Sequence, residues 1–207
     1  MSTATSQGNS RWTTPPLLVG DYVRLEPLSP DHADGLRSAT EDGRLWELAY
    51  TNVPAPEEVD GWIARALEMQ AAGQGMPFAV RDARGLVVGS TRYYDLLPDT
   101  PRLQIGYTWY ARSAQRSGLN SEAKLLLLGH AFEVLGCASV GLQTSTRNVA
   151  SRAAIARLGA SLEGITRQHL RHRDGSLRDT ANYSVIDSEW PTVKAALQRD
   201  LGDRRHD

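Results

Sequence analysis

The amino-acid sequence predicts a single mixed α/β domain with the element order β-α-α-β-β-β-α-β-α-β-β, followed by a C-terminal helix. Segments of alternating apolar residues, typical of strands, are interleaved with segments whose apolar residues have helical spacing. The length of 207 residues fits one large domain, and no internal repeat, low-complexity tract or linker divides the chain. We therefore expect one domain over residues 17–201, a disordered leader over residues 1–16 and a polar tail over residues 202–207.

The N-terminal part of the domain is predicted to contain one strand and two helices. Tyr22–Pro27 alternates, with its apolar residues on one face, and is typical of a strand. Ser29-Pro30-Asp31 has the features of a helix start: an N-cap residue, a proline at the first helical position and an acidic first turn. A second helix follows the proline-containing loop at Val53–Pro56, and its apolar residues recur at helical spacing: Val59, Trp62, Ile63, Ala66 and Leu67.

The middle of the chain is predicted to form three strands and a long helix. The strands are expected over Phe78–Arg81, Leu86–Tyr94 and Leu103–Tyr110, and a turn at Asp82–Gly85 joins the first two as a hairpin. A glycine-containing loop, Ala111–Asn120, then leads into a helix that ends at Gly136. The remaining elements are expected as a strand over Ala138–Thr144, a helix from Asn148 to Leu158, strands over Ser161–Arg173 and Leu177–Asp187, and a helix over about Trp190–Leu201.

The composition excludes several classes of protein. The 23 basic and 24 acidic residues give a formal charge of −1, which removes any general electrostatic argument for binding nucleic acid or a membrane surface. No apolar run approaches the roughly 18 residues of a membrane-spanning helix, and the N-terminal stretch lacks the apolar core of a secretory signal. The single cysteine, Cys137, excludes an internal disulfide, and the five histidines have no metal-ligand spacing. These features favour a cytoplasmic protein without a bound metal.

One loop is a candidate phosphate site. It lies between a predicted strand and a helix N-terminus, where backbone N–H groups lack intrahelical partners and the helix dipole is positive. Gly118 permits close approach of a ligand to the backbone, while Arg116 and Ser121 offer side-chain donors. An ordinary capped loop is the alternative interpretation. The residues concerned are Gln115, Arg116, Ser117, Gly118, Leu119, Asn120 and Ser121.

Other nucleotide and nucleophile motifs are missing. The sequence contains neither the phosphate-binding Gly-x4-Gly-Lys-Ser/Thr pattern nor the dinucleotide-binding Gly-x-Gly-x-x-Gly pattern. Ser121–Lys124 matches the Ser-x-x-Lys of penicillin-binding enzymes, but the Ser-Asp-Asn and Lys-Thr-Gly partners of that motif are absent. We interpret this match as a coincidence.

Four segments together resemble the GNAT superfamily, and more narrowly its RimJ/RimL-type branch of N-acetyltransferases. The segments are Gln104–Tyr110, Gln115–Asn120, Ser121–Leu128 and Arg147–Gly159, and the resemblance extends over Leu18–Leu197. The loop matches the family pattern Gln/Arg-x-x-Gly-x-Gly/Ala except for its last residue, Asn120. The resemblance implies a GNAT-like fold, with a mixed, mostly antiparallel sheet and a splayed central strand pair.

The resemblance also implies acetyl-coenzyme A as the acetyl donor, with its pyrophosphate on the 115–121 loop. Main-chain groups near Thr108, Trp109 and Tyr110 would bind the pantetheine arm and the thioester carbonyl. Asn148 would hydrogen-bond the same arm, and Ser151 would be the catalytic residue that protonates the departing thiolate. The alternatives are structural, because Asn148 is also a good N-cap and serine is common in a first helical turn.

The chemistry requires a neutral amine, and the general base is unassigned. Many RimJ/RimL-like sequences have a glutamate before Ile-Gly-Tyr, but Gln104 occupies that position here and cannot act as a base. Four other residues remain as unranked candidates: Glu47, Asp95, Glu163 and His169. Without a carboxylate at position 104, we expect preference for an α-amine, which is partly neutral at cellular pH, over a lysine side chain.

Substrate contacts are expected from Arg44–Tyr50, from Arg92–Asp95 and from a local basic patch near the C-terminus. The patch would suit a carboxylate- or phosphate-bearing substrate. Its alternative interpretation is a solvated hairpin edge, where charges deter pairing with other chains. The patch comprises Arg167, His169, Arg171, His172 and Arg173.

The sequence therefore predicts an acetyl-coenzyme A-dependent N-acetyltransferase that acts, as a monomer or homodimer, on a protein N-terminus or a small amine. No nucleic-acid or membrane partner is expected. Two rival hypotheses remain open: a non-catalytic acyl-coenzyme A sensor, and an acyltransferase that uses succinyl-coenzyme A. Fold alone does not decide among them, because function depends on the site.

Overall fold

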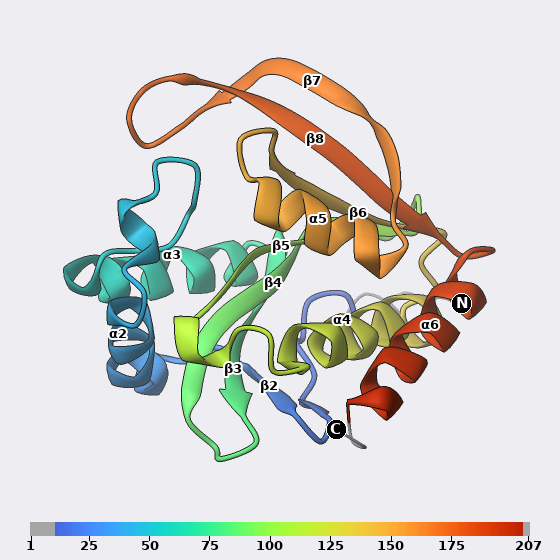
Figure 1. The fold of residues 1–207 in the computed structure, drawn as a ribbon, viewed down its shortest axis with the longest axis horizontal. Helices are drawn as coiled ribbons and strands as arrows, with labels where there is room; N and C mark the ends of the chain where they lie inside the picture. Colours follow the sequence, from blue (N-terminus) through green and yellow to red (C-terminus); the bar gives the residue numbers. More distant parts are fainter. Residues whose placement is uncertain (1–10, 205–207) are drawn as a thin grey trace, which may run out of the picture.

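The computed structural model describes residues 11–204, which form one eight-stranded sheet with helices on both faces (Figure 1). The strand order is β1-β2-β3-β4-β5-β6-β8-β7, and every neighbouring pair is antiparallel except β5 and β6. The strands are β1 (Leu18–Val19), β2 (Val23–Pro27), β3 (Gly75–Asp82), β4 (Val87–Leu97), β5 (Arg102–Tyr110), β6 (Ser139–Ser145), β7 (Ser161–Arg171) and β8 (Leu177–Ile186).

The helices divide between the two faces of the sheet because successive residues of a strand point to opposite sides. On β4, the Tyr93 hydroxyl donates to the Leu127 carbonyl of α4, whereas the neighbouring Arg92 lies over the Trp62 ring of α3. Thus α2 and α3 cover one face, and α4 covers the other beside α5 and α6 (Figure 1). The helices are α2 (Ala33–Glu41), α3 (Val59–Ala71), α4 (Leu119–Gly129), α5 (Val149–Leu158) and α6 (Trp190–Asp203).

The predicted order of strands and helices is confirmed. The structure adds the two-residue strand β1 and a short 3-10 helix at Leu45–Glu47, neither of which has a clear periodicity in the sequence. The long helix after the glycine-containing loop continues from α4 into a π-helical turn at His130–Val134 and is followed by Gly136, whose φ of 70° is left-handed. None of the helices in the described part of the chain is long and apolar enough to cross a membrane.

The predicted leader was too long at its C-terminal end. Trp12 is buried and packs in the hydrophobic core, so the chain is already part of the domain before residue 16. A single tryptophan in a polar stretch has no periodicity, which is why the sequence did not indicate its burial. The rest of that prediction, residues 1–10, lies outside the described residues, as do residues 205–207 of the predicted tail.

The sheet opens between its two central parallel strands, as predicted. Four residue pairs join β5 to β6, from Arg102 opposite Ser139 to Ile105 opposite Leu142. Beyond Ile105, β5 continues to Tyr110 without a register partner in β6. A bulge at this point shifts the β4–β5 register, and Tyr107 has a φ of 51°. The splay thus begins at Gly106, slightly earlier than the Thr108–Tyr110 region expected from the sequence.

Candidate active site

The loop that precedes α4 presents a continuous run of free backbone donors. Among the described residues, the N–H groups from Arg116 to Ser121 have no hydrogen-bond partner, and the first helical bond runs from the Glu122 N–H to the Gly118 carbonyl. Arg116 and Gly118 have φ angles of 64° and 85°, in the left-handed region, whereas Ser117 between them does not have a positive φ. Such alternation of backbone conformation turns successive N–H groups toward one concave side, which is called a nest. This is the backbone geometry that binds phosphate groups at a helix N-terminus.

The side chains of the loop are mostly engaged within the protein. Gln115 Nε2 donates to the Tyr110 carbonyl at 3.1 Å, and Ser117 Oγ donates to the Ala114 carbonyl at 2.7 Å. Ser121 Oγ donates to Asp200 of α6 at 3.0 Å. Leu119 is buried and can offer only its N–H. The free donors of the loop are therefore its backbone amides, rather than the Ser121 hydroxyl suggested by the sequence.

A second cation lies beside this loop that the sequence analysis did not identify. The side chain of Arg204, the C-cap residue of α6, is close to Gly118, since a β-carbon added at Gly118 would meet the Arg204 Cδ at 3.4 Å. Arg204 Nε also forms an ion pair with Asp200 at 3.2 Å. No local pattern links a C-terminal arginine to a loop more than eighty residues earlier, so only the packing of α6 on α4 reveals it.

The start of α5 lies close to the point where β6 leaves the sheet. Asn148 caps this helix: its Oδ1 accepts a hydrogen bond from the Ser151 N–H at 3.0 Å. Its N-cap role is thus confirmed, and the amide Nδ2 has no partner within residues 11–204. The Ser151 hydroxyl is likewise unpartnered within that range, and the residue is half-buried.

Trp109 and Tyr110 end β5 with buried side chains on the far side of the bulge. Trp109 packs edge-on against Trp62 with ring centroids 6.3 Å apart. Its indole Nε1 and the Tyr110 hydroxyl are buried without a hydrogen-bond partner in the described structure, and burial raises the pKa of Tyr110. Their side chains therefore support the core, and only their main chain adjoins the opening between β5 and β6.

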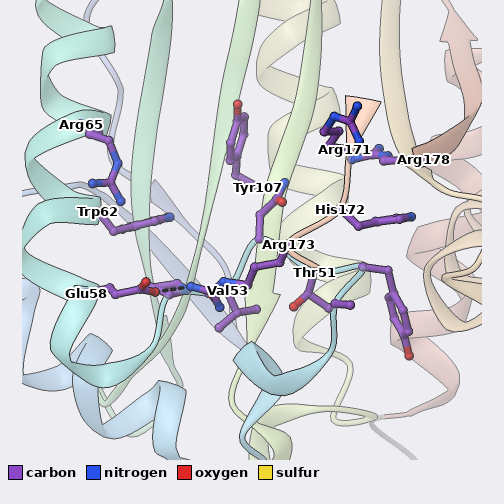
Figure 2. A pocket seen from close by; sticks show the side chains of 14 residues that line it. Thr51, Val53, Glu58, Trp62, Arg65, Tyr107, Arg171, His172, Arg173 and Arg178 are labelled. Carbon is purple, nitrogen blue, oxygen red and sulfur yellow. Dashed lines mark hydrogen bonds and ion pairs between the residues drawn. The ribbon is translucent and has the colours of Figure 1, made fainter. Parts of the chain in front are cut away.

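A cavity of about 340 Å³ lies on the α3 side of the sheet, between α3 and the tip of the β7–β8 hairpin (Figure 2). It reaches β5 at Tyr107, one residue past the start of the splay. We call it the arginine pocket. Its lining residues are Ala49, Tyr50, Thr51, Asn52, Val53, Pro54, Glu58, Trp62, Arg65, Tyr107, Arg171, His172, Arg173 and Arg178.

Arg173 joins the two walls of the arginine pocket. From the hairpin tip its Nη1 donates to the carbonyls of Trp46 at 3.1 Å and Val53 at 3.2 Å, and its Nη2 pairs with Glu58 (Figure 2). A bond from the Ala55 N–H and the pairing with Arg173 hold the pKa of Glu58 below its usual range. The predicted basic patch is thus divided: Arg171, His172 and Arg173 line the pocket, whereas Arg167 and His169 do not.

None of the four candidate bases lines this pocket. Glu47 pairs with Arg44, and Asp95 accepts a hydrogen bond from Gln104 at 3.3 Å. Glu163 lies in a smaller cleft beside Gln104, and the His169 ring contacts Thr180.

His172 does line the arginine pocket, although the sequence analysis did not consider it as a base. Its Nε2 lies 3.3 Å from the Ser145 hydroxyl at the end of β6. Burial and the charges of Arg147 and Arg178 lower its pKa, which favours the neutral imidazole near pH 7.

Lys124 is a buried cation on the opposite side of the bulge. It is 8% exposed, and its Nζ donates to Thr108 Oγ1 at 3.2 Å, which in turn lies 2.7 Å from Thr91 Oγ1. No carboxylate contacts it within the described structure. Burial lowers its pKa to about 7 from the ordinary 10.5.

We expect Lys124→Met to raise the melting temperature near pH 7 by several degrees, and to raise it less at pH 10. Between about pH 7 and 10.5 the unfolded state binds a proton at this lysine that the folded state does not, so the unfolding free energy of the native protein rises with pH. Methionine removes this penalty at neutral pH. Lys194→Met, at the exposed second lysine of the chain, is the matched control and should show no such pH dependence. If both substitutions changed the melting temperature equally at both pH values, this would contradict the lowered pKa of Lys124.

A family model described as an acetyltransferase (GNAT) domain matches residues 23–161, more than half of the chain. The chain belongs to the GNAT acetyltransferase family. This GNAT chain is an N-acetyltransferase, and its eight-stranded sheet with an opened central pair is the GNAT fold.

Solved structures and a curated relative agree with this assignment. A GCN5-related N-acetyltransferase from Brucella melitensis is 34% identical, with a TM-score of 0.79 and coverage of 89% of this chain and 84% of that one. The uncharacterized N-acetyltransferase YoaA of Bacillus subtilis (strain 168) is 23% identical over 83% of this chain and 97% of its own length. RimL, a ribosomal L7/L12 alpha-N-protein acetyltransferase in complex with coenzyme A, has a TM-score of 0.71 at 19% identity over 84% of this chain and 99% of its own, which shows the shared fold.

Proposed function

We propose that this GNAT enzyme transfers an acetyl group from acetyl-coenzyme A to a primary amine, with an α-amine as the preferred acceptor. The observation that carries the proposal is the run of free N–H groups from Arg116 to Ser121, next to the opening between β5 and β6. A pyrophosphate needs several convergent donors and a positive helix terminus, and this loop supplies both. Arg116 and Arg204 add positive charge beside it.

The residues on the α4 side then have consistent roles. The pantetheine arm would lie along β5 beyond Ile105, where the main chain has no partner in β6. Asn148 would donate from Nδ2 to that arm, because its Oδ1 is already occupied by the Ser151 N–H. The free Ser151 hydroxyl would supply a proton to the departing thiolate.

The acceptor would enter from the arginine pocket, on the other face of the sheet. Tyr107 lines this pocket and adjoins the splay, so an amine there would meet the thioester through the opening. The amine nitrogen attacks the thioester carbonyl, an amide bond forms and the carbon–sulfur bond breaks. The amine loses its proton and the thiolate gains one. The RimL name, which includes an alpha-N-protein acceptor, supports an α-amine here.

A free-thiol release assay tests the proposal directly. The protein is given acetyl-coenzyme A or succinyl-coenzyme A with a panel of small amines and N-terminal peptides. Amine-dependent thiol release with the acetyl donor, and little with the succinyl donor, is the expected result. Tight coenzyme A binding without release in any mixture would favour a sensor, and faster release from the succinyl donor would favour the other acyltransferase.

On a peptide with both a free N-terminus and an internal lysine, we expect acetylation of the α-amine to be faster by about two orders of magnitude near pH 7. The reason is ionisation, since an α-amine has a pKa of about 7.7–8.0 and a lysine side chain about 10.4. The rate should rise through about pH 7–8 as the acceptor loses its proton. Mass spectrometry of the product locates the acetyl group, and acetylation mainly on lysine would reject the preference.

Gln104→Glu is expected to change the rate on this peptide only modestly. Gln104 bonds Tyr94 and Asp95 rather than lining the arginine pocket, so the proposed reaction does not depend on a charge at this position. A large gain of activity in this variant would contradict the prediction, because it would show that a carboxylate at position 104 does accelerate the reaction.

A further inference from the structure

The arginine pocket has an excess of positive charge that the protein does not neutralise. Four arginines line it, and Glu58 is the one carboxylate among its lining residues. That carboxylate is already paired with Arg173. Arg178 is half-buried, whereas Arg65, Arg171 and Arg173 are exposed. Cations gathered around one pocket repel one another and attract anions, so such a cluster indicates a ligand that brings negative charge.

Two of these arginines are free to bind a ligand. Arg65 extends from α3 and Arg178 from β8, and they lie on opposite sides of Tyr107 (Figure 2). Neither has a hydrogen-bond or ion-pair partner within residues 11–204, and Arg178 Nε is buried without one. Burial lowers the pKa of Arg178, yet a guanidinium stays charged at neutral pH. Arg171, by contrast, donates to the Gly175 carbonyl at 2.8 Å.

A further cation lies behind the pocket lining. Arg92 is 3% exposed, and its guanidinium lies 4.2 Å from the Tyr107 ring centroid and 5.1 Å from that of Trp62. Burial lowers its pKa to about 10, so it too is charged at pH 7, and its Nε has no partner in the described structure. Two of the aromatic rings that line the pocket, those of Trp62 and Tyr107, are thus backed by positive charge.

We propose that the arginine pocket binds a carboxylate of the acceptor, so that the substrates are amines carrying a carboxylate within about one residue of the reacting nitrogen. A guanidinium fork matches a carboxylate in charge and in geometry, and Arg65 and Arg178 approach from two sides. The volume of about 340 Å³ is in the range of a small-ligand site and suits a moiety the size of an amino-acid residue.

The positive charge of the arginine pocket also explains how the amine can react without a carboxylate at position 104. Cations close to an ammonium group lower its pKa and so favour the neutral, nucleophilic form. A simple amine would be repelled from such a pocket while protonated. In an amine that carries a carboxylate, the arginines would attract the carboxylate. They would then favour loss of the proton from the ammonium group nearby.

The inference rests on the proposed function, and the test separates the two. Acetylation rates are measured on matched acceptors: serine against serine amide, and Ser-Asp-Gly-Gly amide against Ser-Asn-Gly-Gly amide, with O-phosphoserine amide as a phosphate comparison. The first pair detects a free amino acid as substrate, and the second detects an acidic peptide N-terminus. We expect kcat/KM to favour the carboxylate member of at least one pair by about tenfold or more.

Arg65→Gln and Arg178→Gln, singly and together, should reduce this preference, and the double variant should bring it close to equality. The readout is the ratio of the two rates within each pair, measured in every variant. Arg167→Gln is the matched control: it removes a cation from the same hairpin but outside the pocket, and the preference should persist. Melting temperatures confirm that each variant is folded.

Three results would overturn the inference while the proposed function stands: equal use of both members of every pair, a preference for the phosphate alone, or a preference that survives in the double variant. Absence of turnover on every amine would instead contradict the proposed function. In that case the inference is tested by calorimetry, which measures how tightly the N-acetylated peptides bind to the protein in the presence of coenzyme A. Binding of the acidic peptide must then be about tenfold tighter than binding of its amide counterpart and must weaken in the double variant.

Discussion

Gly118→Val should abolish the stabilisation of the protein by coenzyme A. In the native protein, coenzyme A at about 100 times its dissociation constant should add about 2.7 kcal/mol to the unfolding free energy and raise the melting temperature by roughly 5–10 °C. Gly118 has a φ of 85° at the N-cap of α4, a conformation that a β-branched residue does not adopt without strain. The substitution therefore distorts the amide nest at its centre.

Gly85→Val is the matched control for this experiment. Gly85 has a φ of 82° and lies in the β3–β4 hairpin with nothing within 4 Å of an added β-carbon, so the substitution imposes similar backbone strain away from the loop. Both variants should melt earlier than the native protein, but only Gly118→Val should lose the shift with coenzyme A. A full shift in Gly118→Val would place the phosphate site elsewhere.

Ser151→Ala should lower kcat by about 10²–10⁴-fold and leave the KM for acetyl-coenzyme A nearly unchanged. A positioned proton donor contributes a factor of this size. The hydroxyl makes no hydrogen bond within the described residues, and the Asn148 cap uses the Ser151 backbone N–H. Removing the hydroxyl therefore costs little structure. Steady-state kinetics measure kcat and KM, and a melting curve tests whether the variant keeps the stability of the native protein.

Ser38→Ala provides the comparison for a serine in a helix without a catalytic role. Its hydroxyl donates to the Asp34 carbonyl on the exposed side of α2. This variant should retain full activity. A loss in Ser151→Ala of less than about threefold, or a loss that follows a lowered melting temperature, would return Ser151 to a purely structural role in the first turn of α5.

The fold was predictable from the sequence because its signals are local. The periodicity of α3, the Asn148 cap and the glycine turns each depend on residues within one or two turns of chain. The loop of free backbone amides before α4 was predictable for the same reason, since its glycine and the following helix are adjacent in sequence. The contacts of the individual side chains in this loop were not predictable. The hydrogen bond from the Ser121 hydroxyl to Asp200, for example, depends on how α6 packs against α4.

The arginine pocket could not be predicted as a unit. Its members come from the loop over residues 49–54, from α3 and the short 3-10 helix before it, from β5 and from the β7–β8 hairpin, which no sequence spacing connects. Lys124 was equally hidden, because a lysine within a leucine-rich helix is usually on the solvent side. Only the packing of α4 against the bulge in β5 shows that its amine is buried beside Thr108.

The short join between β5 and β6 has a consequence for the width of the arginine pocket. Four residue pairs connect the part of the sheet that carries α3 with the part that carries the hairpin, and the pocket has one wall on each. A small rotation of the two parts about this join would widen or narrow the pocket without unfolding either. The guanidinium of Arg173 spans both parts and restrains that rotation. Substitutions at Ile105 or Leu142, which touch no substrate, could therefore change which acceptors fit.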